Sequence, residues 1–426
     1  MSSLTWPGDE RAGRLFSDGA LIAAMVRVEA AWLAALIDAG IADPDAAVSE
    51  PVLSGFAGDD DVGGLAAASE SGGNPVIPLV ALLRERLGDG HATAARWLHR
   101  GLTSQDVLDT ALMLCARDAV SQVRADLHVQ LGTLVRLADA HRETLMVART
   151  LTQHAVPTTF GAKAAAWGRG LADAAEDAAA LAYPVQLGGA AGSLAASVEL
   201  ARLTGATDPV ATAGRLVEHT AEALALDVRD PWHTERAPVT RLADALVRCT
   251  DAWGRIANDV LVLSRPEVAE LAEPAVDGRG GSSTMPQKTN PVLSTLVRRA
   301  ALSAPQLAAT VHLASADAVD ERPAGAWHAE WPALQTLARR AVVASSQAGE
   351  LLTGLQVHPE RMRATLEAAL PGVLAERDAL AELVGPSEDP TEDPTADPLT
   401  GYLGVADRLV DDLLTRHAAP DGGGTR

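Results

Sequence analysis

One apolar stripe constrains the fold of this chain more than any other feature. Between residues 242 and 263, apolar residues recur at alternating steps of four and three, at Leu242, Leu246, Cys249, Trp253, Ile256, Val260 and Leu263. A repeat of 3.5 residues is typical of helices that pack side by side at a shallow angle. The stripe therefore predicts a long helix in a bundle, with Trp253 in its core.

The same helical periodicity covers most of the chain. From Ser104 to Leu134 apolar residues recur in steps of three and four, which predicts one very long helix. Similar patterns cover residues 158–181, 291–315 (with a kink at Pro305) and 334–352, whereas strand alternation is hard to find. We therefore predict an all-α fold, an elongated bundle of long helices. Helices of this length cannot bury their stripes in a compact monomer, so we expect copies of the chain to associate.

Changes in composition predict three domains. Residues 1–103 hold short helices with Gly and Pro breaks, residues 104–345 hold the long helices, and residues 346–426 hold short helices again. Within the last domain, residues 385–398 repeat Glu-Asp-Pro-Thr, which indicates an acidic, proline-rich linker. A final amphipathic helix is expected over 404–416.

The charge balance argues against two classes of partner. The 426 residues include 35 Lys and Arg and 56 Asp and Glu, a net charge of −21. Nucleic acids and anionic membranes attract basic surfaces, so neither is an expected partner. The apolar stretch 19–42 is interrupted by Arg27, Glu29 and Asp38, which indicates a buried helix rather than a signal peptide. Two cysteines without disulfide spacing favour a reducing, cytoplasmic location.

The stretch from Arg279 to Pro291 carries the clearest sign of chemistry. It reads Arg-Gly-Gly-Ser-Ser-Thr-Met-Pro-Gln-Lys-Thr-Asn-Pro. Glycines give such a loop the freedom to close over a ligand, while adjacent hydroxyls and a lysine suit an anion. On composition alone, a plain surface loop is an equally good interpretation.

The motifs of this loop and of two other regions resemble those of the fumarase/aspartase superfamily. Residues 281–291 match the signature Gly-Ser-Ser-x-Met-Pro-x-Lys-x-Asn-Pro at all eight specified positions. Residues 99–106 (His-Arg-Gly-Leu-Thr-Ser-Gln-Asp) and 149–157 (Arg-Thr-Leu-Thr-Gln-His-Ala-Val-Pro) resemble the two other signature regions, in the expected order. Residues 73–80, 103–106 and 326–331 look most like the bacterial 3-carboxy-cis,cis-muconate cycloisomerase branch of that superfamily.

The resemblance implies a homotetramer in which three subunits contribute to each active site. It implies that Ser282 moves the Cα proton, and that Lys288 and Asn290 hold the carboxylate that takes up charge. Thr103, Ser104 and Gln105 would bind another carboxylate. A helix start favours an anion on physical grounds as well, because its first N–H groups are unpaired. Simple N-capping by Thr103 or Ser104 is the alternative.

Further candidates follow from the same resemblance. The remaining substrate-binding candidates are Ser283, Gln153, Arg322 and Asn74, although an ordinary salt bridge would also explain Arg322. His99 and His154 are candidates for proton transfer or carboxylate binding, and a purely structural role is the alternative for each. His328 is expected to pack beneath the site.

Leu151 departs from the superfamily pattern in an informative way. Many members place a histidine directly after Arg-Thr, to protonate the leaving group, and a leucine cannot do so. An amine leaves as a strong base and needs that acid, whereas a carboxylate needs none. Leu151 therefore favours lactone chemistry over C–N cleavage.

These observations predict an intramolecular lyase that acts on a small polycarboxylate. The expected reaction is the lactonisation of 3-carboxy-cis,cis-muconate to 4-carboxymuconolactone in protocatechuate (β-ketoadipate) catabolism. Two alternatives stay open: adenylosuccinate lyase or a related fumarate-releasing C–N lyase, with His154 as the acid, and a catalytically silent structural homologue. Neither a metal nor a cofactor is expected, since no HExxH spacing or phosphate-binding glycine motif is present.

Overall fold

The computed structural model describes residues 4–385 and 397–418, which form two compact units. The first comprises Met1–Gln122, Ala180–Val247 and Ala304–Val343, and the second comprises Val123–Ala179, Arg248–Ser303 and Ala344–Arg426. Most of the predicted linker over 385–398 lies outside the described residues. The division into three consecutive domains stays a prediction.

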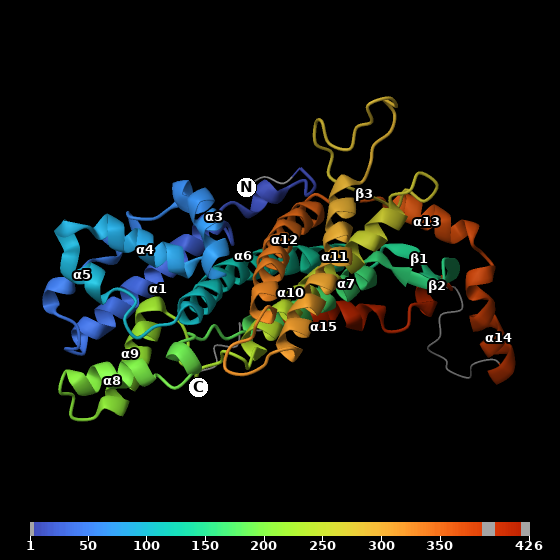
Figure 1. Ribbon diagram of the computed structural model, residues 1–426. Helices are drawn as coiled ribbons and strands as arrows, with labels where there is room; N and C mark the ends of the chain where they lie inside the picture. The colour runs from blue at the N-terminus through green and yellow to red at the C-terminus, as the bar shows by residue number, and fades with distance from the viewer. Residues whose placement is uncertain (1–3, 386–396, 419–426) are drawn as a thin grey trace. The chain divides into compact units, whose positions relative to one another are not determined.

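Four long helices contain residues of both units. They are α6 (Ser104–Ala140), α10 (Ala237–Leu263), α11 (Val292–Ala316) and α12 (Ala326–Thr353). All seven residues of the predicted α10 stripe are buried, including Trp253, whose Nε1 donates a hydrogen bond to Gln130 Oε1 at 2.7 Å. Pro305 lies inside α11 as predicted. The long helices expected from the apolar periodicity are thus present in a mostly helical fold (Figure 1).

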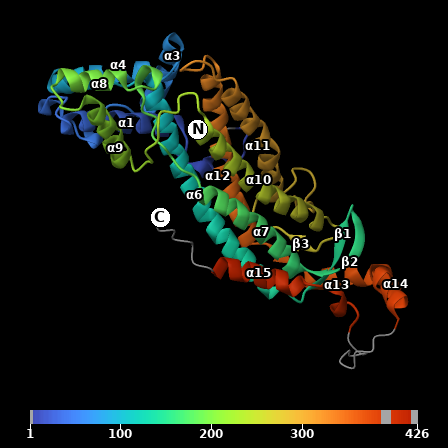
Figure 2. The same cartoon turned by 90° about the horizontal axis from the view of Figure 1, so that it is seen from below.

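The remaining helices of the first unit are shorter. They are α1 (Asp18–Asp38), α2 (Glu50–Ser54), α3 (Val62–Gly72), α4 (Val76–Leu87), α5 (Ala92–Trp97), α8 (Ala195–Leu203) and α9 (Pro209–Leu224). Among the described residues, α1 alone is long and apolar enough to cross a membrane, and 61% of its most apolar window is buried inside the protein. It packs against α9, which in turn contacts α8 (Figures 1 and 2).

The second unit contains two small β-sheets that the sequence pattern did not predict. Strands β1 (Leu145–Thr150) and β2 (Gln153–Thr159) form an antiparallel hairpin, and β3 (Leu271–Ala272) pairs with β4 (Gln356–Val357). The hairpin lacks an alternating pattern because three successive residues of β1 are buried and the pairing is irregular after Val147. The second signature region, expected within a helical chain, therefore lies on this hairpin.

Helices α7 (Phe160–Ala179), α13 (Pro359–Ala368), α14 (Ala375–Val384) and α15 (Ala406–Ala418) complete the second unit. Helix α13 contacts β1, and α15 lies along α7 (Figure 2). Gly168 allows that close approach, because a Cβ there would come within 2.6 Å of the Leu413 side chain. Val410 and Leu413 fill a core shared with Ala164 and Ala165.

Candidate active site

The turn before α6 in the first unit is anchored by side chains from two other helices. Trp32 Nε1 on α1 donates to the Arg100 carbonyl at 2.7 Å, and Arg84 on α4 donates to the Leu98 carbonyl at 2.7 Å. Gly101 adopts a φ of 88°, and a Cβ there would come within 2.9 Å of Ser197 Oγ. Only glycine suits that position. The backbone of the first signature region is therefore fixed before α6 begins.

Asp106 ties the start of α6 to a distant segment. Its fully buried carboxylate accepts hydrogen bonds from the N–H groups of Thr103 (2.9 Å), Gly188 (2.9 Å) and Gly189 (3.0 Å). The bond to Thr103 is one half of a capping box, which satisfies a backbone donor ahead of the helix. The Arg322 guanidinium donates to the Thr103 hydroxyl. Two predicted substrate-binding side chains thus meet at the helix start.

Gln105 faces the interior rather than the surface. Its fully buried side chain donates to Asp109 Oδ2 at 3.1 Å and to the His233 carbonyl at 2.9 Å. Its Oε1 has no hydrogen-bond partner among the described residues. Ser104, by contrast, is half-buried. In this conformation Ser104 is better placed than Gln105 to meet a ligand.

A buried ion network that we did not predict lies under this helix start. Arg236 pairs with Asp109 at 2.7 Å and with Glu330 at 2.7 Å, and Trp327 Nε1 donates to Asp109 Oδ1 at 2.9 Å. Burial alone would lower the pKa of Arg236, but the two carboxylates outweigh it, so that the pKa is raised. The pKa of Glu330 is also raised, because burial disfavours its charged form. The sequence signal was available, because Asp109 interrupts an apolar helical run.

His233 is a second buried residue that the sequence did not single out. Its ring nitrogens lie 3.1 Å from Gln186 Nε2, and Gln186 Oε1 accepts from the Trp232 N–H at 2.6 Å. His233 Nε2 also lies 3.5 Å from Asp106 Oδ1. Together these contacts fix the buried side chains that pack against residues 103–106.

His99 is paired with a buried carboxylate. Its Nδ1 lies 2.6 Å from Glu29 Oε1 on α1. Burial alone would lower the pKa of His99, but the hydrogen bond and charge of Glu29 outweigh it and raise the pKa. The residue has a left-handed φ of 65°, which costs on the order of 1 to 2 kcal/mol for a non-glycine residue.

Asn74 lies in a loop of the first unit whose Gly73 is close to His328. Asn74 is buried and bonds to its own loop, accepting from the Val76 N–H at 3.1 Å and donating to the Gly72 carbonyl at 3.2 Å. His328 Nε2 lies 3.6 Å from where a Cβ on Gly73 would be. The His328 ring is exposed and contacts the Trp331 ring, with centroids 4.6 Å apart. Asn74 therefore has a structural role beside any role in binding.

The hairpin tip of the second unit presents the second signature region to solvent. Arg149 forms an ion pair with the buried Glu270 at 2.6 Å, which anchors the base of the tip. Leu151 and Thr152 form the turn with left-handed φ values of 47° and 70°, and Leu151 is 96% exposed. Gln153 and His154 are exposed beside it. An exposed leucine in a strained turn is unfavourable unless another surface covers it.

The third signature region forms a loop that extends away from the start of α11 (gold in Figure 1). Ser282 Oγ accepts hydrogen bonds from the N–H groups of Thr284 (3.4 Å) and Met285 (3.2 Å). Asn290 closes the base, since its N–H and its Nδ2 both donate to the Gly280 carbonyl, at 2.8 and 2.9 Å. Ser283 and Lys288 are exposed.

A cavity lies at the base of this loop. It measures about 540 Å³ and is lined by residues of the stretches 272–279 and 289–291, with Ser264 and Gln356. Arg279 borders it and pairs with Glu350 at 2.6 Å. Glu273 also borders it and accepts from the N–H groups of Leu293 and Ser294, which caps α11. The loop is therefore fixed at its base, while Ser282 is half-buried and residues 283–289 are exposed.

The predicted site residues divide evenly between the two units. The first unit holds Asn74, His99, Thr103, Ser104, Gln105 and Arg322, and the second holds Gln153, His154, Ser282, Ser283, Lys288 and Asn290. Of these twelve, the structure joins Thr103 to Arg322 by a hydrogen bond. Among the described residues, no group of three or more His, Cys, Asp or Glu side chains could hold a metal ion.

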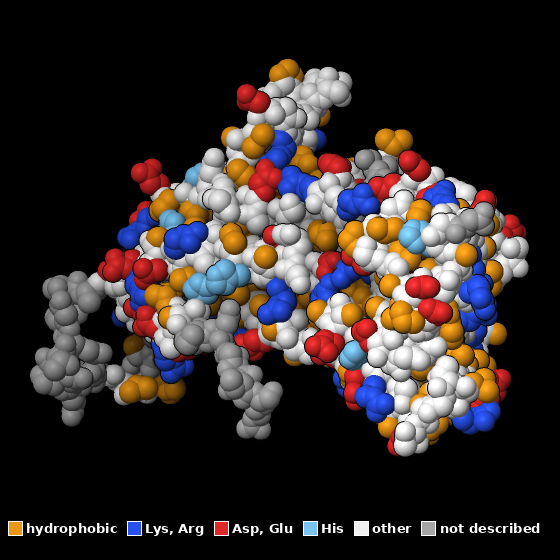
Figure 3. All heavy atoms as spheres, turned by 90° about the vertical axis from the view of Figure 1, so that its left-hand side faces the viewer, with side chains coloured by type: hydrophobic (Ala, Val, Ile, Leu, Met, Phe, Trp, Pro, Cys, Tyr) orange, Lys and Arg blue, Asp and Glu red, His pale blue; other side chains and the backbone are white. Residues whose placement is uncertain are grey.

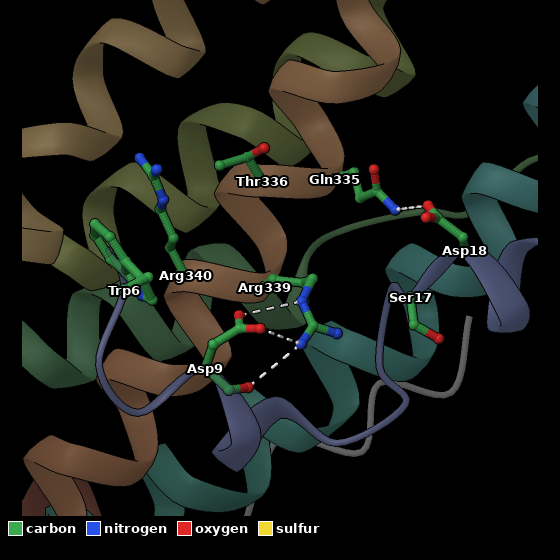
Figure 4. Close-up of a pocket in the computed structure, with 8 residues that line it drawn as sticks. All are labelled: Trp6, Asp9, Ser17, Asp18, Gln335, Thr336, Arg339 and Arg340. Atoms are coloured by element: carbon green, nitrogen blue, oxygen red, sulfur yellow. Dashed lines mark hydrogen bonds and ion pairs between the residues drawn. The ribbon is translucent and has the colours of Figure 1, made fainter. Parts of the chain in front are cut away.

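Another cavity in the first unit involves none of these residues (Figure 4). It measures about 360 Å³. Its polar groups bind one another: Arg339 pairs with Asp9 at 3.0 Å, and Gln335 donates to Asp18 at 2.8 Å. The Arg340 guanidinium lies over the Trp6 ring, 4.0 Å from its centroid. These contacts hold the N-terminal segment on α12.

Charged side chains of both signs are interspersed on the face drawn in Figure 3. With a net charge of −21, the chain repels anions at long range. A polycarboxylate would thus depend on local donors such as Arg322 and Lys288.

Comparison with known proteins supports the motif analysis. A family model described as a lyase family matches residues 28–305. The chain belongs to the fumarase/aspartase superfamily. Within this superfamily, it is 45% identical over 377 residues to a nitrosuccinate lyase of Streptomyces davaonensis, covering 87% of this chain and 78% of the relative. It is 40% identical over 374 residues to a 3-carboxy-cis,cis-muconate cycloisomerase of Bradyrhizobium diazoefficiens, covering 85% and 79%.

Solved structures of the superfamily agree with the fold. The 3-carboxy-cis,cis-muconate lactonizing enzyme from Pseudomonas putida matches with a TM-score of 0.83 at 31% identity, over 95% of this chain and 96% of that one. A fumarate lyase from Mesorhizobium matches with a TM-score of 0.79 at 28% identity, over 97% and 100%. The protein is thus an enzyme-superfamily member with an intact signature loop.

Proposed function

We propose that the protein is a 3-carboxy-cis,cis-muconate cycloisomerase. The observation that carries the proposal is Leu151, an exposed apolar residue at the hairpin tip, where many superfamily members have a proton-donating histidine. A carboxylate that leaves or adds is a weak base and needs no such donor. Several relatives with this activity, 34–40% identical to the chain, support the same conclusion.

In the proposed reaction, a carboxylate oxygen of the substrate adds to a C=C bond of the same molecule. The new C–O bond moves an electron pair to the carbon α to another carboxylate, which becomes an aci-carboxylate. Ser282 donates its hydroxyl proton to that carbon and recovers a proton from water. The developing negative charge would be stabilised by Lys288, Arg322 and the N-terminus of α6. The closed site would hold the carbon chain of the substrate in the folded conformation that the attack requires.

A homotetramer that completes each site from several subunits is part of the proposal. In one chain the signature residues Leu151, Gln153, His154, Ser283 and Lys288 are exposed, which suits surfaces that a neighbouring subunit covers. Helix α11 also exposes Pro305, Ala309 and Leu313 on one face, at four-residue spacing. Such an unpaired apolar face favours association.

Elimination of nitrite from nitrosuccinate is the second candidate. The relative that is 45% identical is named a nitrosuccinate lyase, and nitrite is the leaving group that we infer for such a substrate. Nitrite, like a carboxylate, is a weakly basic leaving group, so Leu151 argues against amine release without separating these two reactions. Residues 73–80, 103–106 and 326–331, which resemble the cycloisomerase branch, favour the lactonisation. An amine leaving group, as in adenylosuccinate, would instead require His154 to serve as the acid.

Ultraviolet absorbance separates these functions. Purified protein is mixed in parallel with 3-carboxy-cis,cis-muconate, nitrosuccinate and adenylosuccinate, with Ser282→Ala as the control. Loss of the conjugated diene absorbance with wild type alone supports the cycloisomerase. Nitrite release or fumarate from adenylosuccinate would assign the corresponding elimination, and no turnover of any substrate would favour a non-catalytic homologue.

A further inference from the structure

Glu29 is a buried carboxylate to which the proposed mechanism gives no role. It lies on α1 with its side chain 0% exposed, and its Oε1 is 2.6 Å from His99 Nδ1. Its Oε2 has no hydrogen-bond partner among the described residues. Burying an ionised carboxylate with so few partners is unfavourable, so the pairing with His99 must compensate.

The pairing leaves one nitrogen of His99 available. Because Nδ1 bonds to Glu29, Nε2 is the nitrogen that can meet a ligand, and within the described chain it makes no hydrogen bond. The His99 side chain is 20% exposed, so it is accessible from one side. The left-handed backbone at residue 99 and the anchored carbonyls on either side fix the direction of the ring.

Three charged side chains, from three different helices, act on His99. Glu29 on α1 and Asp106 on α6 favour the protonated imidazole. Burial and the Arg84 guanidinium on α4 oppose it, and Arg100 is the next residue along the chain. The two carboxylates prevail, and the pKa of His99 is raised.

We propose that Glu29 is a positioning residue that holds the Nδ1 side of His99 and directs its Nε2 toward a substrate carboxylate. The same carboxylate would contact Thr103 and Arg322 at the start of α6. This inference rests on the proposed function, since only an anionic substrate gains from a cation here. It assigns to α1, which contributes no signature residue, a part in substrate binding.

The direct test is the titration of His99. Exchange of the imidazole C2 hydrogen for deuterium, followed by mass spectrometry of peptides, reports the pKa of individual histidines. We compare wild type with Glu29→Gln, Glu29→Asp and Glu50→Gln, which removes an exposed charge from α2. Glu29→Gln should lower the pKa of His99 by at least one unit, Glu29→Asp by less, and Glu50→Gln not at all. His141 serves as an internal reference in every variant.

Steady-state kinetics with 3-carboxy-cis,cis-muconate then test the binding role. Loss of one charge-assisted hydrogen bond should raise KM about tenfold at neutral pH in Glu29→Gln, with a smaller change in kcat. Lower pH should restore KM, because it protonates His99 again, and Glu29→Asp should retain most of the affinity. An unchanged KM beside a lowered His99 pKa would overturn the binding role. The titration needs no substrate. An unchanged pKa of His99 in Glu29→Gln would therefore contradict the role of Glu29, whichever substrate the enzyme uses.

Discussion

At the scale of single residues, the buried guanidinium of Arg236 forms ion pairs with two buried carboxylates, those of Asp109 and Glu330. Replacing Arg236 with Met would leave Asp109 and Glu330 buried without their cation. Removing one partner of a buried ion pair costs about 3–5 kcal/mol. We therefore expect Arg236→Met to lower the urea midpoint strongly, as measured by circular dichroism.

The matched control is Arg363→Met. Arg363 pairs with Glu367 one helical turn away, and both side chains are about half exposed. Exposed pairs of this kind contribute little, so the urea midpoint should stay close to that of wild type. Equal losses in the two variants would contradict the role assigned to the buried network.

Ser282 is the residue whose loss should affect chemistry most. Ser282→Ala removes the hydroxyl proposed to move the Cα proton, and we expect kcat to fall by about 10²–10⁴-fold. Thr284→Ala changes a neighbouring hydroxyl of the same loop and should reduce kcat far less. Both variants should have the melting temperature of wild type, measured by calorimetry.

At the scale of elements, the base of the signature loop depends on a glycine. Gly280 has a φ of 75°, and a Cβ there would come within 2.6 Å of the Asn290 carbonyl oxygen. Gly280→Ala should therefore displace Asn290 and lower kcat/KM at least tenfold. A Cβ on Gly281 would meet no atom within 4 Å, and this residue needs no left-handed backbone. Gly281→Ala should therefore lower kcat/KM less than Gly280→Ala does. If Gly281→Ala is the more damaging of the two, the loop base is not the cause.

The helices α6 and α10 each bury one cysteine. Burial raises the pKa of Cys115 and of Cys249 to about 12. At pH 8 both thiols stay protonated and unreactive in the folded protein. Iodoacetamide should thus add to neither until denaturant unfolds the chain, as followed by intact mass. Rapid labelling of the native protein would show that these helices open.

Sequence predicted the long helices and failed at the hairpin for a physical reason. An apolar stripe at 3.5-residue spacing is a local property of a helix, and the stripe of α10 is buried throughout. The strands of the hairpin instead bury Leu145, Met146 and Val147 in succession, so their sequence has no alternation to detect.

In the candidate site, too, residues that are contiguous in sequence could be predicted, whereas residues brought together by folding could not. Motif matching found the exposed loop and the start of α6, because those residues are contiguous. The buried partners Arg236 and Glu330 come from distant segments and become a group only on folding. Gln105 illustrates the difference, because the motif predicts a ligand contact while the structure buries its side chain.

At the scale of the whole molecule, a shared active site predicts complementation between inactive variants. Ser282→Ala and Thr103→Ala would each inactivate every site of a homotetramer. If the residues of one site come from different subunits, unfolding and refolding the two variants together restores some intact sites. We expect recovery of up to about a quarter of wild-type activity, whereas variants refolded separately stay inactive. No recovery would place the site within a single chain.

The oligomeric state itself can be measured by light scattering. We expect the mass of four chains for wild type, and smaller species for Leu313→Glu, since a carboxylate would break the exposed apolar face of α11. His312→Glu, at the preceding position, changes a side chain that already bonds to Asp244 within its own unit, and should leave the tetramer more intact.

The carboxylate of Asp106 has a consequence for the order in which the chain folds. This carboxylate, at the first turn of α6, accepts hydrogen bonds from the N–H groups of Gly188 and Gly189, which are 82 and 83 positions further along the chain. Contacts between such distant positions form late, because a long loop must close before they stabilise anything. The middle of α6 can therefore become helical early, while its first turn, which follows Thr103, forms only when residues 188 and 189 are in place. During refolding, far-ultraviolet helicity should return before catalytic activity does.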